Sequence, residues 1–138
     1  MSNPSKEKGT KAETKVARYL TTQGLRTTRR PLAGSADKGD LRMLLPSGEE
    51  VTLEVKAGKQ TQNFPRSRMD KWKRETLQEG RNAKCRCALV VVRYRRAFTD
   101  TEVWLPNSQW GGVNGWTMIH IDMFADAMWI LDDQAREE

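Results

Sequence analysis

The chain has 138 residues, 37% hydrophobic and 30% charged, which is enough for one domain with a single modest core. Its net charge of +6 is unevenly spread: residues 1–100 hold 23 Lys and Arg against 11 Asp and Glu, whereas residues 101–138 hold one Arg against seven acids. This asymmetry favours a partner covered in phosphates. Because no apolar run is long enough for a membrane span and the N-terminus lacks the apolar core of a secretory signal, we expect a cytoplasmic protein.

Cysteine usage argues against a disulfide framework and against zinc. Cys85 and Cys87 are one residue apart, so in a strand their side chains would point to opposite faces. With a single histidine in the sequence, they are also too few for the usual four-ligand zinc site. Any metal in this protein would therefore be held by oxygen ligands.

Hydrophobic periodicity and turn residues divide the chain into helices and strands. In chain order the pattern predicts a flexible basic lead-in (1–9), a helix (10–22), a strand (25–30), a loop (31–38), two hairpin strands (40–45 and 50–56), a polar loop (58–65), a basic helix (67–79), a buried strand (87–94), two short strands (102–105 and 116–121) and a closing helix (123–135). This order predicts a single α/β domain over residues 1–138, with a central mixed β-sheet flanked by α-helices.

The predicted hairpin carries the most informative residues. If it turns about Ser47, its alternating pattern pairs apolar residues on one face, such as Leu41 with Leu53. On the other face the same register pairs Asp40 with Glu54. Lys56 joins that face, two residues further along the strand, where the adjacent acids are expected to hold its ammonium group.

A carboxylate pair of this kind is a natural cation site. Side chains directly opposite each other in a hairpin start about 5 Å apart at Cβ, and two carboxylates at that separation repel unless a positive charge lies between them. Mg²⁺ is typically held by one or two carboxylates together with water and substrate phosphate oxygens. Such an ion polarises a phosphate and lowers the pKa of a bound water, while a neighbouring lysine could orient that water or neutralise charge in the transition state.

The residues Gly39-Asp40, followed by Glu54-Val55-Lys56 on the next strand, resemble the Asp…Glu-x-Lys core of the PD-(D/E)xK nucleases. Over residues 8–96 the order of motifs further resembles the archaeal-type Holliday junction resolvases of that superfamily. The other residues that carry this resemblance are Lys8-Gly9, Ala12-Glu13, Arg30, Ala33-Gly34-Ser35 and Val92-Arg93-Tyr94. The resemblance implies a restriction-endonuclease-like fold and a Mg²⁺-dependent endonuclease, with Mn²⁺ as the alternative metal. It also implies a homodimer that cuts four-way DNA junctions. The small size and compact layout of the chain suit a prokaryotic or phage genome.

The resemblance assigns roles residue by residue. Asp40, Glu54 and the helix-borne Glu13 resemble the metal ligands, and Lys56 resembles the catalytic lysine. Residues that resemble contacts to DNA phosphates are Arg30, Ser35 and Arg93. The basic helix adds cations suited to backbone contacts with DNA, namely Arg66, Arg68 and Lys71.

Several of these residues have a second interpretation. Glu13 stands three residues after Thr10, which matches a capping box that needs no metal. Ser35 could be a turn residue beside Gly34. Two departures from the family pattern also stand out: Gly39 replaces the proline of the motif, and two extra residues, 31 and 32, lengthen the loop after Arg30.

Three functions fit the sequence. The favoured one is a resolvase, followed by another PD-(D/E)xK nuclease of the repair or restriction type acting on duplex or single-stranded DNA. The last is a non-catalytic module that binds nucleic acid. The basic helix could equally be an amphipathic surface helix with Trp72 in the core, and the acidic segment 101–138 either completes the core or forms a dimer interface.

Overall fold

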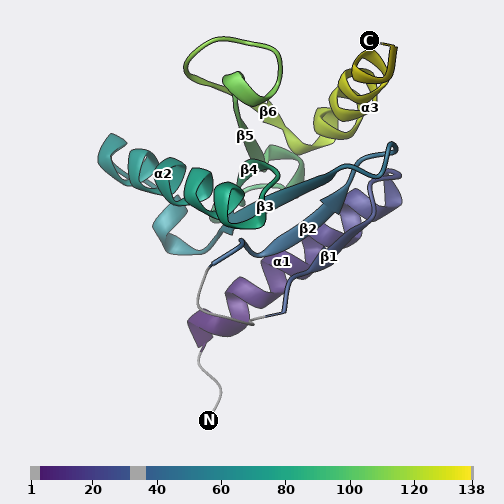
Figure 1. Cartoon of the computed structure of the whole chain (residues 1–138). Coiled ribbons are helices and arrows are strands. Elements are labelled where there is room, and N and C mark those ends of the chain that lie inside the picture. The colour runs from purple at the N-terminus through teal and green to yellow at the C-terminus, as the bar shows by residue number, and fades with distance from the viewer. Residues whose placement is uncertain (1–3, 32–36, 138) are drawn as a thin grey trace.

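A computed structural model describes residues 4–31 and 37–137, with side chains described for residues 9–31 and 37–134. The helices and strands are α1 (Pro4–Thr22), β1 (Thr27–Arg29), β2 (Leu41–Leu44), β3 (Glu50–Lys56), α2 (Arg66–Ala83), β4 (Arg86–Val91), β5 (Glu102–Pro106), β6 (Trp116–His120) and α3 (Ile121–Glu137). Within these ranges six strands form one sheet in chain order (Figure 1). Only β3 and β4 run parallel; the other neighbours are antiparallel. The predicted mixed α/β sheet is confirmed.

Helices cover both faces of the sheet. On one face, Val16 of α1 and Phe124 of α3 belong to the same buried cluster, which also contains Leu41 and Leu53 from the hairpin. On the other face, α2 packs Met69 and Trp72 against Leu89 and Val91 of β4. The α2 helix is the crossover that the parallel β3–β4 pair requires, and it closes the face of the sheet that carries the polar side chains of the hairpin.

The hairpin register is confirmed. Leu41 pairs with Leu53 and Met43 with Val51, and all four side chains are buried. Alternation of apolar and polar residues sets this register, since a slip by one residue would turn every apolar side chain away from the core.

The first two helices are longer than the sequence pattern indicated. The α1 helix begins at Pro4, so the prediction of a flexible lead-in is wrong for residues 4–9, and Thr10 is not a helix cap. The α2 helix continues through Gly80, which was expected to end it, to Ala83. A Cβ at Gly80 would lie 3.1 Å from Cβ of Cys87, so the glycine serves close packing against β4. Lys84, with φ of 57°, takes the left-handed position after the helix.

The C-terminal helix α3 has one buried side and one exposed side. Ile121, Phe124 and Met128 are fully buried in the core, whereas Met123 and Ile130 are each 59% exposed. The acidic segment therefore completes the core through one side of α3 and presents apolar side chains on the other. Among the described residues, no helix combines the length and apolar character needed to cross a bilayer.

Candidate active site

Asp40 and Glu54 meet where β2 begins beside β3. Asp40 precedes β2, and its Oδ2 accepts a hydrogen bond of 2.9 Å from the backbone N–H of Val55. Glu54 lies within β3 and is only 7% exposed. Burial raises the pKa of Glu54, and hydrogen bonds with the carboxyls of Asp40 and Glu79 raise it further. The two acids that the sequence placed in register are thus neighbours in a protected site.

Two further acids, which sequence reasoning missed, complete this group. One carboxylate oxygen each from Asp37, Glu54 and Glu79 lie within 4.8 Å of one another. Asp37 comes from the loop before β2, and Glu79 comes from α2. Burial raises the pKa of Glu79, the charges of Asp37 and Asp40 add to this effect, and a hydrogen bond from Glu54 opposes it. A signal for Glu79 was present in the sequence: it lies on the buried stripe of α2 formed by Met69, Trp72, Thr76 and Glu79.

Gly39 connects these acids at a close approach of the backbone. Its φ of +94° is unavailable to proline, which explains why the residue before Asp40 departs from the motif. A side chain here would collide with Oγ1 of Thr52, and its Cβ would lie 3.3 Å from Oε2 of Glu79. The backbone N–H of Gly39 also donates to Oδ1 of Asp37 at 2.9 Å. Glycine therefore lets the loop reach under α2 and bring Asp37 to the cluster.

Lys56 lies at the end of β3 and is directed toward α2. Its Nζ is 3.3 Å from Oε2 of Glu75 and lies 5.9 Å from the ring centre of Trp72. We expected the ammonium group to be held by Asp40 and Glu54, but its ion pair is with Glu75, because α2 packs beside the end of β3. The charge of Lys56 also lowers the pKa of Glu79, so the lysine remains electrostatically part of the acidic site.

Glu13 reaches the same region from α1. Its Oε2 accepts a hydrogen bond of 3.0 Å from Nε of Arg29. Burial raises the pKa of Glu13, and the charge of Asp40 adds to this effect, while Arg29 opposes it. Since the helix begins well before Thr10, the capping-box interpretation of Glu13 is wrong. Its assignment as a metal ligand stays a prediction.

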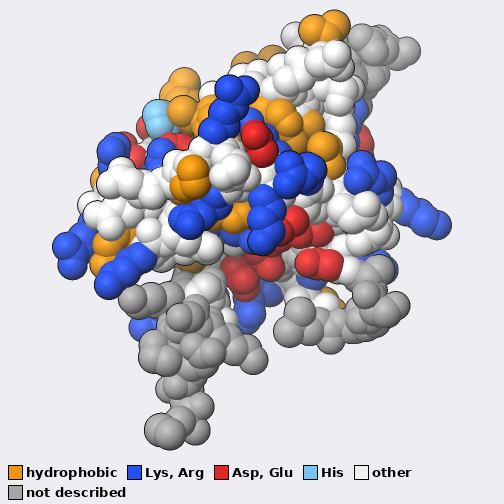
Figure 2. Space-filling model, turned by 90° about the vertical axis from the view of Figure 1, so that its left-hand side faces the viewer, with side chains coloured by type: hydrophobic (Ala, Val, Ile, Leu, Met, Phe, Trp, Pro, Cys, Tyr) orange, Lys and Arg blue, Asp and Glu red, His pale blue; other side chains and the backbone are white. Residues whose placement is uncertain are grey.

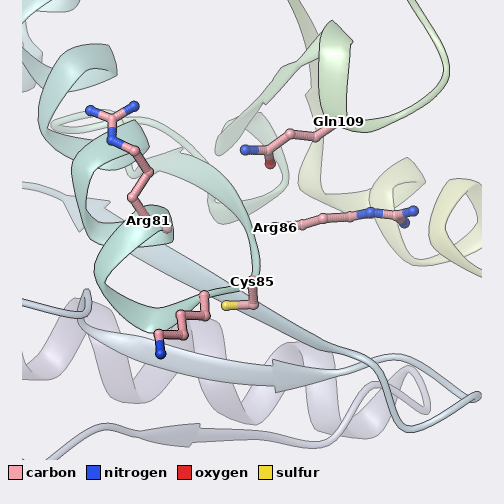
Figure 3. A pocket seen from close by; sticks show the side chains of 6 residues that line it. Arg81, Cys85, Arg86 and Gln109 are labelled. Atoms are coloured by element: carbon pink, nitrogen blue, oxygen red, sulfur yellow. The ribbon is translucent and has the colours of Figure 1, made fainter.

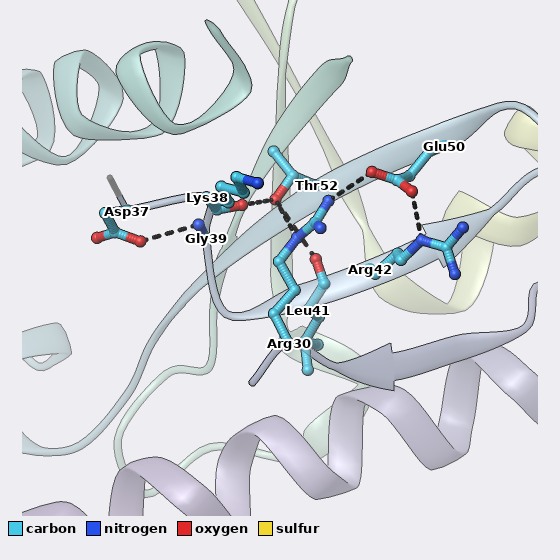
Figure 4. Close-up of polar contacts among 8 residues, drawn as sticks. All are labelled: Arg30, Asp37, Lys38, Gly39, Leu41, Arg42, Glu50 and Thr52. Atoms are coloured by element: carbon cyan, nitrogen blue, oxygen red, sulfur yellow. Dashed lines mark hydrogen bonds and ion pairs between the residues drawn. The ribbon is translucent and has the colours of Figure 1, made fainter. Parts of the chain in front are cut away.

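Arg30, which follows β1 and was expected to contact DNA, forms hydrogen bonds with protein groups (Figure 4). Arg30 donates to Oε2 of Glu50 at 2.8 Å and to Oγ1 of Thr52 at 3.2 Å. Thr52 in turn donates to the carbonyl oxygen of Lys38. Arg30 thereby braces the strand that carries Glu54 and the loop that carries Asp37, and its contact with DNA stays a prediction. Ser35 lies outside the described residues.

Arg93, after β4, is similarly engaged. It donates to Oε2 of Glu102 and to the carbonyl oxygen of Thr61, both at 2.8 Å, and its guanidinium carbon lies 4.7 Å from the ring centre of Phe64. These contacts tie the segment after β4 to the loop before α2. They give Arg93 a structural role beside the predicted contact with DNA.

Exposed basic side chains lie on α2, and two of them also contact protein groups: Lys71 is 3.9 Å from Glu75, and Arg68 donates to the carbonyl oxygen of Gln60. Arg66 and Arg68 at the start of α2 are exposed, and the side chain of Lys71 is 67% exposed. Figure 2 shows acidic side chains gathered at the centre of one face, with Lys and Arg side chains around them. A polyanion could bind to such a border while one of its phosphates lies near the acids, provided that a cation bridges the two.

A hollow lies at the C-terminal end of α2 (Figure 3). It has a volume of 370 Å³ and is lined by Gly80, Arg81, Lys84, Cys85, Arg86 and Gln109. Oε1 of Gln109 accepts a hydrogen bond of 2.9 Å from the backbone N–H of Cys87, which fixes one wall. Because its lining includes no acid, this hollow does not share the chemistry of the acidic cluster.

The fold is similar to that of a known nuclease. A solved structure of Hjc from Archaeoglobus fulgidus, a Holliday junction resolvase from an archaeal hyperthermophile, matches 87% of this chain and 99% of its own with a TM-score of 0.52 and 14% sequence identity. No protein-family model matches the sequence, and no curated protein does. The chain therefore has the restriction-endonuclease-like fold found in an archaeal resolvase, which confirms at the level of fold the resemblance carried by its Asp…Glu-x-Lys residues.

Proposed function

We propose that this protein is a divalent-metal-dependent DNA endonuclease that cuts four-way junctions by phosphodiester hydrolysis. The observation that carries the proposal is the meeting of Asp40 and Glu54 where β2 begins beside β3, with Lys56 two residues further along β3, within a fold shared with a resolvase. Neither the cluster nor the fold alone would define a nuclease, since acidic groups are common on protein surfaces and folds host many functions.

The residues at this site suit a hard cation. They are carboxylates, the oxygen donors that Mg²⁺ and Mn²⁺ prefer, and Glu54 is buried against the carboxyl of Asp40. Asp40 and Glu54 would hold the ion, with Glu13 approaching from α1. When bound, the ion would supply Lewis-acid activation of a phosphate and a more acidic water.

Each protein group then has a task of its own. The backbone N–H of Val55 fixes the Asp40 carboxylate, so this ligand is oriented before substrate arrives. Lys56, anchored by Glu75, holds a positive charge near the reacting phosphate, where it could orient the nucleophile or stabilise the charge that develops in the transition state. The exposed cations Arg66, Arg68 and Lys71 would bind DNA phosphates beside the cut.

Cutting two opposed strands of a junction requires two active sites, so we propose a homodimer with two-fold symmetry. The exposed apolar side chains of α3 are the candidate interface: Met123, Trp129 and Ile130 are 59%, 40% and 59% exposed. Their position on the acidic segment leaves the basic border of the catalytic acids free for DNA.

The test is cleavage of an end-labelled four-way DNA junction in Mg²⁺, with excess linear duplex as competitor. We expect paired symmetric nicks in the junction, lost in Glu54→Gln of β3 and retained in Asp70→Asn, a matched loss of one carboxylate on α2. Cleavage of junction and duplex alike would support the assigned active site but would show that the substrate is duplex DNA in general. Tight binding with no cleavage in Mg²⁺ or Mn²⁺ would overturn the proposal and leave a non-catalytic binding module.

A further inference from the structure

The acidic cluster contains more carboxylates than the Asp40–Glu54 pair requires. Interactions with the carboxyls of Asp40 and Glu79 add to the effect of burial in raising the pKa of Glu54. The oxygens grouped within 4.8 Å are those of Asp37, Glu54 and Glu79. Glu54 therefore lies between Asp40, at the start of the hairpin, and a pair of acids formed by Glu79 of α2 and Asp37 of the loop before β2.

Glu79 is the unusual member of this group. It is only 4% exposed, and its Oε2 is buried without a hydrogen-bond partner among the described residues. Burial of an unpartnered carboxylate oxygen costs free energy, since its hydration is lost and nothing replaces it. One oxygen of this buried acid is thus left without a partner among the described protein contacts, and a cation would supply it.

Asp37 is held in place to complete such a site. Its Oδ1 accepts from the backbone N–H of Gly39, and its carbonyl oxygen accepts from Nδ2 of Asn82 on α2 at 2.7 Å. The loop is therefore tied to the same helix that carries Glu79. Oxygen ligands of one Mg²⁺ or Mn²⁺ ion lie roughly 3–4 Å from one another. The three carboxylate oxygens here lie within 4.8 Å of one another, so shifts of about 1 Å in the side chains would bring them to ligand positions.

We propose that Asp37, Glu54 and Glu79 form a second divalent-cation site, on the α2 side of Glu54, which shares that residue with the catalytic site. The inference rests on the proposed function for its catalytic consequence, because a cation there would keep Glu54 oriented toward Asp40. Its existence as a binding site is independent of the DNA substrate. Three carboxylates from the protein suffice to hold a cation without DNA, whereas the Asp40 site would also use oxygens from a substrate phosphate.

The competing explanation is that Glu54 and Glu79 are simply a carboxyl–carboxylate pair that shares one proton. In that case Glu79 has a structural role, and loss of its charge changes no metal affinity. The two explanations differ in a measurement that involves no cleavage.

The experiment is a titration of the full chain with Mn²⁺ in the absence of DNA, followed by the electron paramagnetic resonance signal of the free aqua ion. We expect wild type to bind Mn²⁺, Glu79→Gln and Asp37→Asn to weaken that binding by at least about tenfold, and Asp70→Asn to leave it unchanged. Thermal unfolding provides a second readout. Mn²⁺ should raise the Tm of wild type by linkage and raise that of Glu79→Gln by less.

Wild-type affinity in Glu79→Gln, or no Mn²⁺ binding by wild type, would overturn this site. Junction cleavage that persists under either outcome would leave the proposed function standing. Conversely, Mn²⁺ binding that depends on Glu79 in a protein that cuts no DNA would support the site and refute the nuclease.

Discussion

Glu50 binds two arginines at once, and its contact with Arg30 joins the edge of the hairpin to the strand before it. Nη2 of Arg30 lies 2.8 Å from Oε2 of Glu50, while Nε of Arg42 binds Oε1. The side chain of Arg30 is 13% exposed, so its charge is largely removed from water and depends on Glu50 for compensation. This arrangement links the stability of the site's framework to the ionisation of one carboxylate.

Glu50→Gln should therefore destabilise the protein in a pH-dependent way. Hydrogen bonds from Arg30 and Arg42 lower the pKa of Glu50 below its usual 4.5. A lowered pKa in the folded state contributes stability above the unfolded pKa, and this contribution disappears as pH falls through the folded pKa. We expect Glu50→Gln to lower the free energy of unfolding by about 1 kcal/mol at pH 7. The difference between variant and wild type should become smaller as pH falls below 4.5, and urea unfolding at a series of pH values measures it. A constant difference at every pH would show that Glu50 acts through packing alone.

The two cysteines should differ in their reactivity in the folded state. Burial raises the pKa of Cys87 to about 11, and burial also raises the pKa of the partly exposed Cys85. Because only the thiolate reacts, alkylation at pH 8 should be slow at both and slowest at Cys87. Mass spectrometry of iodoacetamide-treated protein would measure this, with unfolded protein as the control. Faster modification of Cys87 than of Cys85 would contradict the packing of β4 against α2.

Local pattern was sufficient for the hairpin but not for the complete acidic cluster. Strand alternation and the turn at Ser47 set the register that brings Asp40 to Glu54, because a two-residue period leaves one way to bury the apolar face. Glu79 and Asp37 join only through the packing of α2 on the sheet, which no local period specifies. The prediction that α2 ends at Gly80 is wrong for the same physical reason. This glycine is required by close packing against Cys87 of β4, and the local sequence of the helix does not reveal that contact.

The predicted ion-pair partner of Lys56 is also wrong, because it too depends on how α2 packs on the sheet. Sequence reasoning placed the lysine among the acids of its own face, and the choice of Glu75 depends on how far α2 extends along β3. The arginines after β1 and β4 also have protein partners in the folded chain. A resemblance between motifs identifies such residues but does not say which acid each one meets.

Binding of DNA should depend on the cations of α2 and hardly on those of α1. The double variant Arg66→Ala with Lys71→Ala should lower the slope of log Kd against log salt by roughly 2, since each phosphate contact contributes about 0.9. The matched control is Arg18→Ala with Arg26→Ala, two exposed cations on and after the helix that covers the opposite face. Filter binding or fluorescence anisotropy of a four-way junction over a range of salt measures both. Equal slopes for the two variants would refute the assignment of the DNA-binding face.

Lys56→Met should separate binding from catalysis. Methionine keeps an apolar stem near Trp72 but removes the charge that pairs with Glu75, so the framework should persist while the transition state loses a positive neighbour. We expect the single-turnover cleavage rate to fall by about 10²–10⁴-fold, with junction affinity changed less than threefold. Lys59→Met, in the exposed turn that follows β3, is the matched control and should cleave at the wild-type rate. If both lysine variants lose the same activity, the effect is one of general charge, and Lys56 has no special place in the reaction.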